Sequence, residues 1–311
     1  MKAEKLSLRV GRQEKGMKLL AFLREKASGL SSVKMLKRAI DEKFCTVNGR
    51  IECFSTHPLK EGDVVELDLA FLSKAKKPIA IDILYEDTDL IVCDKHPGVV
   101  SENKNFQGLA KSIFLVHRLD KETSGCLILA KSNAVKQKMI ELFEAKKVRK
   151  FYLAIVDGII KKDQGRIENY LGKVHTCQGG AIYGKCAPYK GQKAITEWKC
   201  LKRGAKASLL LLKPLTGRTH QLRAHLSEIG HPILGDLQYG HKFSSTFHPR
   251  RHLLHAWRLF FPHPQTEEEI KAEAPLPQDF RQAMKAVLQM HSGTAFGQTN
   301  KGDRGSHLGS L

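Results

Sequence analysis

The segment from Val116 to Ser132 reads VHRLDKETSGCLILAKS and contains the residue on which the fold and the chemistry depend, Asp120. Apolar residues approach it from Ile113 to Val116, and a second apolar run follows from Cys126 to Ala130. Two apolar runs around a Thr-Ser-Gly turn predict two buried strands that hold the carboxylate between them. A carboxylate held in this way is suited to act as a nucleophile or base, although a side chain that merely caps the turn has the same local pattern.

The charge of the chain indicates the class of partner. Its 311 residues include 52 Lys and Arg against 32 Asp and Glu, a formal net charge of +20. This excess favours a polyanion such as nucleic acid. A membrane surface is the competing interpretation, but no segment combines a basic face with a bulky apolar one. No apolar run approaches the length of a membrane span and the N-terminus is charged, so we expect a cytoplasmic protein.

Cysteine and histidine spacing gives no metal-binding pattern. The seven cysteines include no C-x-x-C pair, which indicates reduced thiols rather than a disulfide framework or a zinc ribbon. His248, His252 and His255 form a local cluster, but no acidic or Cys partner stands at ligand spacing. We therefore predict no metal site and interpret these histidines as exposed or RNA-facing.

The hydrophobic pattern divides the chain into segments and predicts an α+β protein. Residues 13–70 read as two short helices followed by a small hairpin sheet, and residues 71–80 as a Lys-rich linker. Residues 81–290 predict a larger domain, with a mixed, mainly antiparallel sheet and flanking helices. We expect residues 291–311 to be a disordered tail.

Two further stretches are interpreted as irregular. Residues 1 to about 15 are polar and predict a poorly ordered arm. Residues 161–192 are rich in Gly and Lys and predict long surface loops.

Two polar residues far from Asp120 complete a candidate site. Tyr152 lies near the start of a predicted strand, after a basic run. The alternative is that it is simply a half-buried aromatic residue of that strand, as is common for Tyr. Arg218 follows a Thr-Gly turn at the predicted start of a helix. The chain has no G-x-G-x-x-G, P-loop, H-E-x-x-H or G-x-S-x-G sequence, so we predict that side chains act on an anionic substrate without a cofactor.

These motifs together resemble the RluA-type pseudouridine synthases, of the type that modifies large-subunit ribosomal RNA. The resemblance covers about residues 81–265 in the correct order, and residues 13–70 resemble the alpha-L RNA-binding domain that often accompanies it. The matching motifs are Asp94–Gly98, His117–Asp120 with Thr123–Gly125, Lys150–Tyr152, Thr216–Arg223 with Gly235-Asp236 and Tyr239-Gly240, and Arg251 with Leu254–Ala256.

The resemblance implies a role for each site residue. Asp120 would be catalytic, Arg218 its ion-pair partner, and Tyr152 the ring that stacks on the flipped uracil. Leu222 would pack on the other face of the uracil, and Arg118 would fill the space that the flipped base leaves. His117 and Lys150 would contact the substrate. Basic residues that could bind phosphates are Lys146, Lys147, Arg149, Lys150, Arg250 and Arg251.

The implied reaction is the isomerisation of specific uridines in structured RNA, most simply large-subunit ribosomal RNA. The reaction involves no redox change or group transfer, so it needs no cofactor, and we expect a monomer. The carboxylate could attack the sugar, attack the ring or assist elimination. Three alternatives stay open: a transfer-RNA pseudouridine synthase, a non-catalytic RNA-binding or ribosome-assembly factor, and a hydrolase of glycosidic bonds with paired carboxylates.

Overall fold

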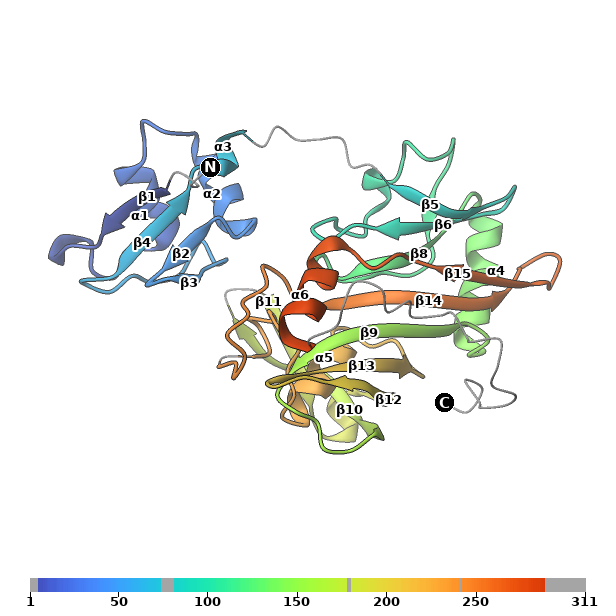
Figure 1. The fold of residues 1–311 in the computed structure, drawn as a ribbon. Helices are drawn as coiled ribbons and strands as arrows, with labels where there is room; N and C mark the ends of the chain where they lie inside the picture. Colours follow the sequence, from blue (N-terminus) through green and yellow to red (C-terminus); the bar gives the residue numbers. More distant parts are fainter. Residues whose placement is uncertain (1–4, 74–80, 178–179, 241, 289–311) are drawn as a thin grey trace. The chain divides into compact units, whose positions relative to one another are not determined.

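The computed structural model describes residues 5–73, 81–177, 180–240 and 242–288 (Figure 1). Contacts within the chain divide it into two units. One comprises residues 1–80 with 175–181, and the other comprises residues 81–174 with 182–311. The predicted disordered tail and most of the predicted linker lie outside the described residues; of the linker, Phe71–Ser73 belong to a short helix, α3 (Ala70–Ser73).

The N-terminal unit contains the two predicted helices, α1 (Leu19–Lys26) and α2 (Val33–Asp41). The Ser32 hydroxyl accepts a hydrogen bond from the Met35 N–H and caps α2. The helices pack beside a sheet of order β1-β4-β2-β3. Its strands are β1 (Lys5–Arg9), β4 (Val64–Asp68), β2 (Cys45–Val47) and β3 (Arg50–Ile51). A 3₁₀ turn, η1, covers Arg12–Glu14.

The N-terminal sheet contains a hairpin with its turn at Asn48-Gly49, as expected for the small hairpin sheet predicted in residues 13–70. Asn48 has φ +52° and Gly49 has φ +74°, the left-handed pair that joins two strands of a tight hairpin. The Asn48 amide also donates to Asp63 and accepts from the Val64 N–H, so the turn is tied to the next strand.

The prediction of a poorly ordered N-terminal arm is wrong for the described part. Strand β1 pairs antiparallel with β4 from Lys5 to Arg9. Leu6 and Leu8 alternate with polar residues and pack against the apolar core of the unit. The period of two was present in the sequence, but it covers only five residues, of which the first and the last are charged.

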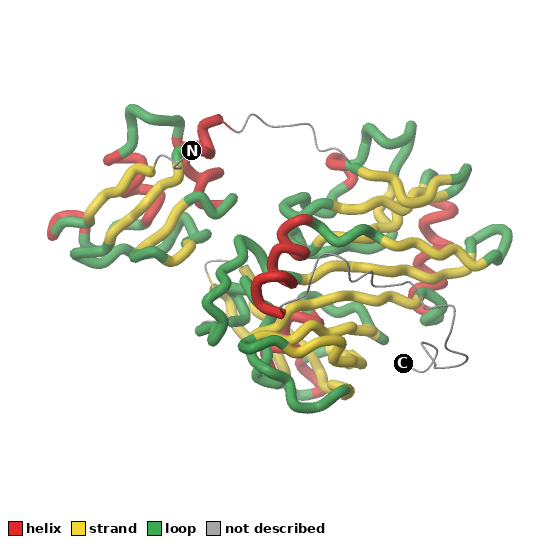
Figure 2. Tube along the Cα trace, in the orientation of Figure 1, coloured by secondary structure: helices red, strands yellow, loops and turns green. Residues whose placement is uncertain are grey.

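The second unit is built on one large sheet, and the predicted α+β class with a mixed, mainly antiparallel sheet is confirmed. The main strand order is β11-β10-β12-β13-β9-β14-β8-β6-β5, with β15 beside β14 and β7 beside β8 (Figures 1 and 2). Among the strand pairings that the structure describes in this sheet, only that of β14 with β8 is parallel. The strands are β5 (Asp82–Glu86), β6 (Leu90–Lys95), β7 (Phe114–Leu115), β8 (Ser124–Ala130), β9 (Arg149–Asp157), β10 (Gln164–Cys177), β11 (Gly180–Lys185), β12 (Gln192–Arg203), β13 (Ala207–Pro214), β14 (Leu254–Pro262) and β15 (Glu269–Glu273).

Both faces of this sheet are covered at its centre. In β6, Ile91 and Cys93 belong to one apolar cluster, whereas Leu90 and Val92 belong to another on the opposite face. Helix α4 (Asn133–Glu144) packs against β8, α5 (Gln221–Glu228) against β12, and α6 (Gln278–Leu288) against β13. Short 3₁₀ turns cover Asn103–Asn105 (η2) and Pro188–Lys190 (η3). None of the described helices is long and apolar enough to cross a membrane.

The predicted surface loops at 161–192 are instead mostly strand. Strand β10 pairs antiparallel with β12, and Ile167, Asn169 and Leu171 point inward at alternate positions. A side chain at Gly165 would stand 2.6 Å from the Trp198 ring, so this glycine permits close packing. Glycines that looked like loop signals therefore mark tight contacts between neighbouring strands.

Candidate active site

Asp120 lies on the loop between β7 and β8. The Thr123 N–H donates to the Asp120 backbone carbonyl over 3.0 Å, which closes the predicted turn, and β8 begins at Ser124. Gly125 has φ +110°, and a Cβ there would stand 2.2 Å from the Ala256 carbonyl oxygen of β14. The loop therefore ends where two parallel strands meet at close range, and only glycine fits there.

Buried side chains fasten the backbone around Asp120. Lys95 is fully buried and its ammonium donates to the Lys121 carbonyl over 3.1 Å. Arg251 donates to the Glu122 carbonyl over 2.9 Å, and Ser101 donates to the Leu119 carbonyl over 3.0 Å. These donors hold the loop from three sides, so the position of the carboxylate is fixed before any ligand arrives.

Two histidines of the His248–His255 cluster belong to the same support. His252 is 2.9 Å from the Thr123 hydroxyl and His255 is 3.0 Å from the Ser124 hydroxyl. Both rings are buried, so the interpretation of these two histidines as exposed or RNA-facing is wrong. Arg251 is also buried and pairs with Asp279 of α6, which contradicts its predicted role as a phosphate ligand.

The ion-pair partner of Asp120 is Arg223, and the prediction of Arg218 is wrong. Arg223 Nη1 lies 3.1 Å from Asp120 Oδ2, and its other nitrogens donate to Asp236 over 2.7 and 2.9 Å. Arg218 instead donates to the Gln192 side chain over 2.9 Å and to the Lys193 carbonyl over 3.1 Å. The reason is that α5 begins at Gln221, so Arg218 precedes the helix while Arg223 lies within its first turn.

The charge of Arg223 is secured by the two carboxylates. Burial alone would lower the pKa of this guanidinium, but the hydrogen bonds and charges of Asp236 and Asp120 raise it above its ordinary value. Only 8% of the Arg223 side chain is exposed, against 29% for Asp120. The site thus presents one accessible carboxylate on a buried, permanently charged support.

Tyr152 and Leu222 line the same apolar core. Both are nearly buried, at 9% and 7% exposure. Tyr152 stands in β9 opposite Ala256 of β14. Burial, and then the negative charge of Asp120, raise the pKa of Tyr152 above its ordinary range. Its hydroxyl therefore keeps its proton at neutral pH, which suits a packing or stacking role better than that of a base.

The three remaining predicted substrate contacts differ in accessibility. Arg118 is exposed. His117 Nε2 accepts the Ile128 N–H over 3.1 Å, and burial lowers the pKa of His117 to about 3, so this ring is neutral and occupied in holding β8. The Lys150 ammonium lies 5.6 Å from the Phe143 ring centroid, and burial, with the nearby charge of Arg218, lowers its pKa to about 8.

Arg223, Asp236 and Tyr239 belong to the motifs found in the sequence, but no role was predicted for them or for His220. The spacing contained a usable signal. Residues three apart lie on one face of a helix, so a polar pair His220 and Arg223 beside Leu222 could have indicated a second polar group directed at the carboxylate.

Comparison with known proteins shows the family of this chain. Residues 89–228 match the family described as RNA pseudouridylate synthase. An uncharacterised RNA pseudouridine synthase of Aquifex aeolicus is 32% identical over 289 residues, which cover 83% of this chain and 89% of the relative. This chain belongs to the RNA pseudouridylate synthase family. The predicted resemblance is confirmed for the large unit, and the protein is an isomerase that acts on RNA.

Further relatives of this pseudouridine synthase have more specific names. Ribosomal large subunit pseudouridine synthase D of Neisseria meningitidis serogroup B is 32% identical and covers 79% of this chain and 69% of the relative. The solved structure titled human RNA pseudouridylate synthase domain containing 1 is 30% identical, with a TM-score of 0.57, over 65% of this chain and 86% of that one.

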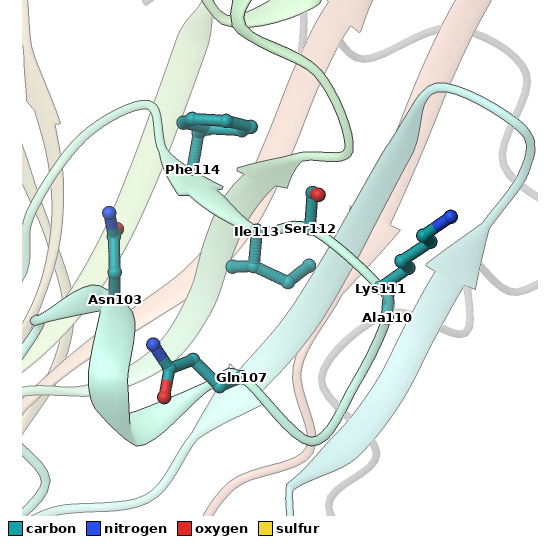
Figure 3. Close-up of a pocket in the computed structure, with 7 residues that line it drawn as sticks. All are labelled: Asn103, Gln107, Ala110, Lys111, Ser112, Ile113 and Phe114. Atoms are coloured by element: carbon teal, nitrogen blue, oxygen red, sulfur yellow. The ribbon is translucent and has the colours of Figure 1, made fainter.

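The synthase also has a pocket of about 330 Å³ near the segment that leads into β7 (Figure 3). Its lining offers two side-chain amides, one ammonium and one hydroxyl beside apolar groups, and it includes neither Asp120 nor Arg223. The lining residues are Asn103, Gln107, Ala110, Lys111, Ser112, Ile113 and Phe114.

Proposed function

We propose that this synthase isomerises specific uridines of large-subunit ribosomal RNA and that Asp120 is its catalytic residue. The observation that carries the assignment of Asp120 is its geometry: an accessible carboxylate whose Oδ2 lies 3.1 Å from a buried arginine that a second carboxylate also holds. The choice of ribosomal RNA is supported by the relatives named ribosomal large subunit pseudouridine synthase C and D and by the net charge of +20.

The arrangement suits the reaction. Pseudouridine forms when the bond between ribose C1′ and uracil N1 breaks, the uracil turns, and C1′ bonds to C5, which then loses its proton. The target base must leave the helical stack to reach the Asp120 carboxylate, which lies on a loop of the protein. Attack on the sugar, attack on the ring and assisted elimination all use a carboxylate oxygen of Asp120, and in each case Arg223 holds Oδ2 of that carboxylate over 3.1 Å.

The predicted substrate contacts other than His117, whose ring holds β8, are kept as parts of this proposal. Tyr152 and Leu222 would contact opposite faces of the flipped uracil, because both border the core beside Asp120. Arg118 is accessible and would stack in the space that the base vacates. Lys150 and Arg218 place two cations close together, which suits an RNA phosphate. The role proposed for Arg218 is therefore contact with RNA and not an ion pair with Asp120.

The N-terminal unit would supply additional RNA affinity. Residues 13–70 are proposed to be an alpha-L RNA-binding domain, supported by two short helices, α1 and α2, beside a four-stranded sheet. We also propose that the protein acts as a monomer, which light scattering of the purified protein in RNA-free buffer tests directly.

The substrate assignment is tested by mapping pseudouridines in cellular RNA. Large-subunit ribosomal RNA and transfer RNA from cells with and without the protein are compared at nucleotide resolution, and purified protein is then added back to both RNAs. We expect sites that disappear from the large-subunit RNA and return on addition. Sites lost only from transfer RNA would overturn the ribosomal assignment and leave the isomerase activity standing.

A further inference from the structure

His220 has a backbone conformation that its position in the helix does not require. It is the N-cap of α5 with φ +54° and ψ +18°, in the left-handed region that non-glycine residues rarely adopt. Its carbonyl accepts the Ala224 N–H over 2.9 Å, but its side chain makes no capping hydrogen bond to the helix. The imidazole therefore does not cap the helix. Uncommon backbone conformations cluster at functional sites, so the contacts of this side chain indicate its role.

Two tyrosines clamp the imidazole. The rings of Tyr183 and Tyr239 each meet the His220 ring edge-on, with centroids 5.7 Å apart in both pairs. His220 Nδ1 lies 3.0 Å from the Tyr239 hydroxyl oxygen. On the other side of the ring, Nε2 lies 3.9 Å from Asp120 Oδ1. One face of the carboxylate therefore meets His220 while Arg223 holds the other oxygen.

The hydrogen bonds assign the proton of the imidazole. The Tyr183 N–H donates to the Tyr239 hydroxyl oxygen over 2.9 Å, and burial raises the pKa of Tyr239 to about 12, so that hydroxyl keeps one proton to donate. Nδ1 of His220 is the acceptor within reach. Burial, and then the charge of Arg223, lower the pKa of His220, which keeps the ring neutral. A neutral ring that accepts at Nδ1 carries its hydrogen on Nε2.

The opposite tautomer is disfavoured at this position. With the hydrogen on Nδ1, the Nε2 lone pair would face the Asp120 carboxylate oxygen, and two acceptors would oppose each other. The hydroxyl of Tyr239 and the charge of Asp120 thus select the same tautomer from opposite sides of the ring.

We propose that His220 is a positioning residue that presents its Nε2–H to Oδ1 of Asp120, while Arg223 holds Oδ2, so that the carboxylate is fixed in one orientation toward the nucleotide. The inference rests on the proposed catalytic role of Asp120. The separation of 3.9 Å exceeds a hydrogen bond, and catalytic contacts that are long without substrate commonly shorten in the complex. Tyr239 acts through His220 by fixing its tautomer.

Two substitutions of His220 distinguish this role from a purely structural one. The amide nitrogen of Gln reaches about as far as Nε2, whereas that of Asn matches Nδ1. Asn adopts the left-handed conformation more readily than Gln. A positioning role predicts that His220→Gln keeps single-turnover isomerisation within about tenfold of wild type, and that His220→Asn loses about 100-fold, with unchanged RNA affinity. A structural role predicts the reverse order, and that order would overturn the inference.

A third variant tests the hydroxyl that selects the tautomer. Tyr239→Phe keeps the edge contact with His220 and removes the donor to Nδ1. We expect a lower single-turnover rate at unchanged RNA affinity, and no further loss when Tyr239→Phe is added to His220→Gln. A wild-type rate in Tyr239→Phe would refute the proposed tautomer.

The outcomes also separate the inference from the function on which it rests. Wild type and Asp120→Asn are assayed in parallel with the three variants. If wild type forms no pseudouridine, the proposed function fails. If wild type is active, Asp120→Asn is inactive and Asn outperforms Gln at position 220, only the role of His220 fails.

Discussion

At the scale of single residues, the candidate active site depends on one arginine held between two carboxylates. Arg223 reaches Asp120 and Asp236, and the Asp236 side chain is almost entirely buried at 1% exposure. A buried charge that loses its partner is costly, whereas an accessible pair contributes little. Arg223 therefore serves both stability and the orientation of Asp120, and the two roles can be separated by substitution.

Replacing Arg223 should affect folding and chemistry together, whereas replacing Arg218 should affect neither strongly. Arg223→Met leaves the Asp236 carboxylate buried without its partner, which we expect to lower the free energy of unfolding by roughly 3–5 kcal/mol. Arg223→Lys keeps the charge but cannot bridge both carboxylates, so we expect a single-turnover rate about 100-fold below wild type. Urea denaturation and single-turnover assays measure the two effects.

Arg218→Met is the matched control for the arginine series. We expect its chemical rate at saturating RNA to stay near wild type and its RNA affinity to fall. A chemical rate as low as that of Arg223→Lys would restore Arg218 as the partner of Asp120.

The two arginines also show what the sequence could and could not provide. The motif from Thr216 to Arg223 was visible, but the choice between its arginines depended on where the helix begins. The prediction placed Arg218 in the first helical turn, whereas the left-handed His220 delays the start of α5 to Gln221. Sequence patterns locate helix ends poorly because a single backbone conformation decides them.

Neutral buried histidines give the protein a defined acid sensitivity. Burial lowers the pKa of His225 from 6.5 to about 4, and its ring is bonded to Thr196 and Asn169. Between pH 6.5 and about 4, His225 is protonated in the unfolded chain but stays neutral in the folded protein. The free energy of unfolding should therefore fall as pH drops from 6.5 toward 4, by about 1.4 kcal/mol per pH unit for this group.

Denaturation of His225→Gln between pH 7 and 4.5 measures this contribution. We expect the pH slope of its unfolding free energy to be shallower than that of wild type by about that amount. His248→Gln, at an exposed position, is the matched control. Equal slopes in the two variants would argue against a neutral buried His225.

At the scale of elements, the contact between β8 and β14 fixes the Asp120 loop. Gly125→Ala would place a methyl group 2.2 Å from the Ala256 carbonyl oxygen at a φ of +110°. We expect a loss of roughly 1–3 kcal/mol from overpacking in addition to the conformational cost, and a lower isomerisation rate because Asp120 shifts. Thermal unfolding and single-turnover assays measure the two changes.

Gly98→Ala is the control for the conformational cost alone. Gly98 has φ +85°, and a Cβ there meets nothing within 4 Å. If Gly98→Ala and Gly125→Ala reduce stability and activity equally, the close approach of β14 has no part in holding the loop.

The elements that sequence patterns missed share a physical cause. The two short N-terminal helices were predicted, and the caps of α2 and α4 are local, because Ser32 and Ser132 each accept the N–H of the third residue beyond them. Strands β1 and β10 were missed, because charged residues and glycines stand among their apolar positions. A hydrogen bond between residues close in the sequence can be predicted from the sequence, whereas the pairing of a strand with a distant partner cannot.

At the scale of the whole molecule, the chain combines two units with different proposed tasks. The large unit contains Asp120 and its supports, while the N-terminal unit has its own apolar core around Phe22, Leu36 and Ile40. Separate cores allow one unit to be removed without unfolding the other. The division of labour can therefore be tested by truncation.

Deletion of residues 1–70 should weaken RNA binding and leave the chemistry intact. We expect a lower affinity for the large-subunit RNA and a shallower dependence of binding on salt, because fewer phosphates are neutralised. Isomerisation of a short target RNA at saturating enzyme should persist. A truncated protein that binds the short RNA but fails to isomerise it would contradict the proposed division.

The central claim is that the Asp120 carboxylate performs the isomerisation. The most direct measurement is the release of tritium from RNA labelled at uracil C5, because bond formation at that carbon expels its hydrogen. Wild type should release tritium, while Asp120→Asn should release none and still bind the RNA. Release by Asp120→Asn at the wild-type rate would contradict the account.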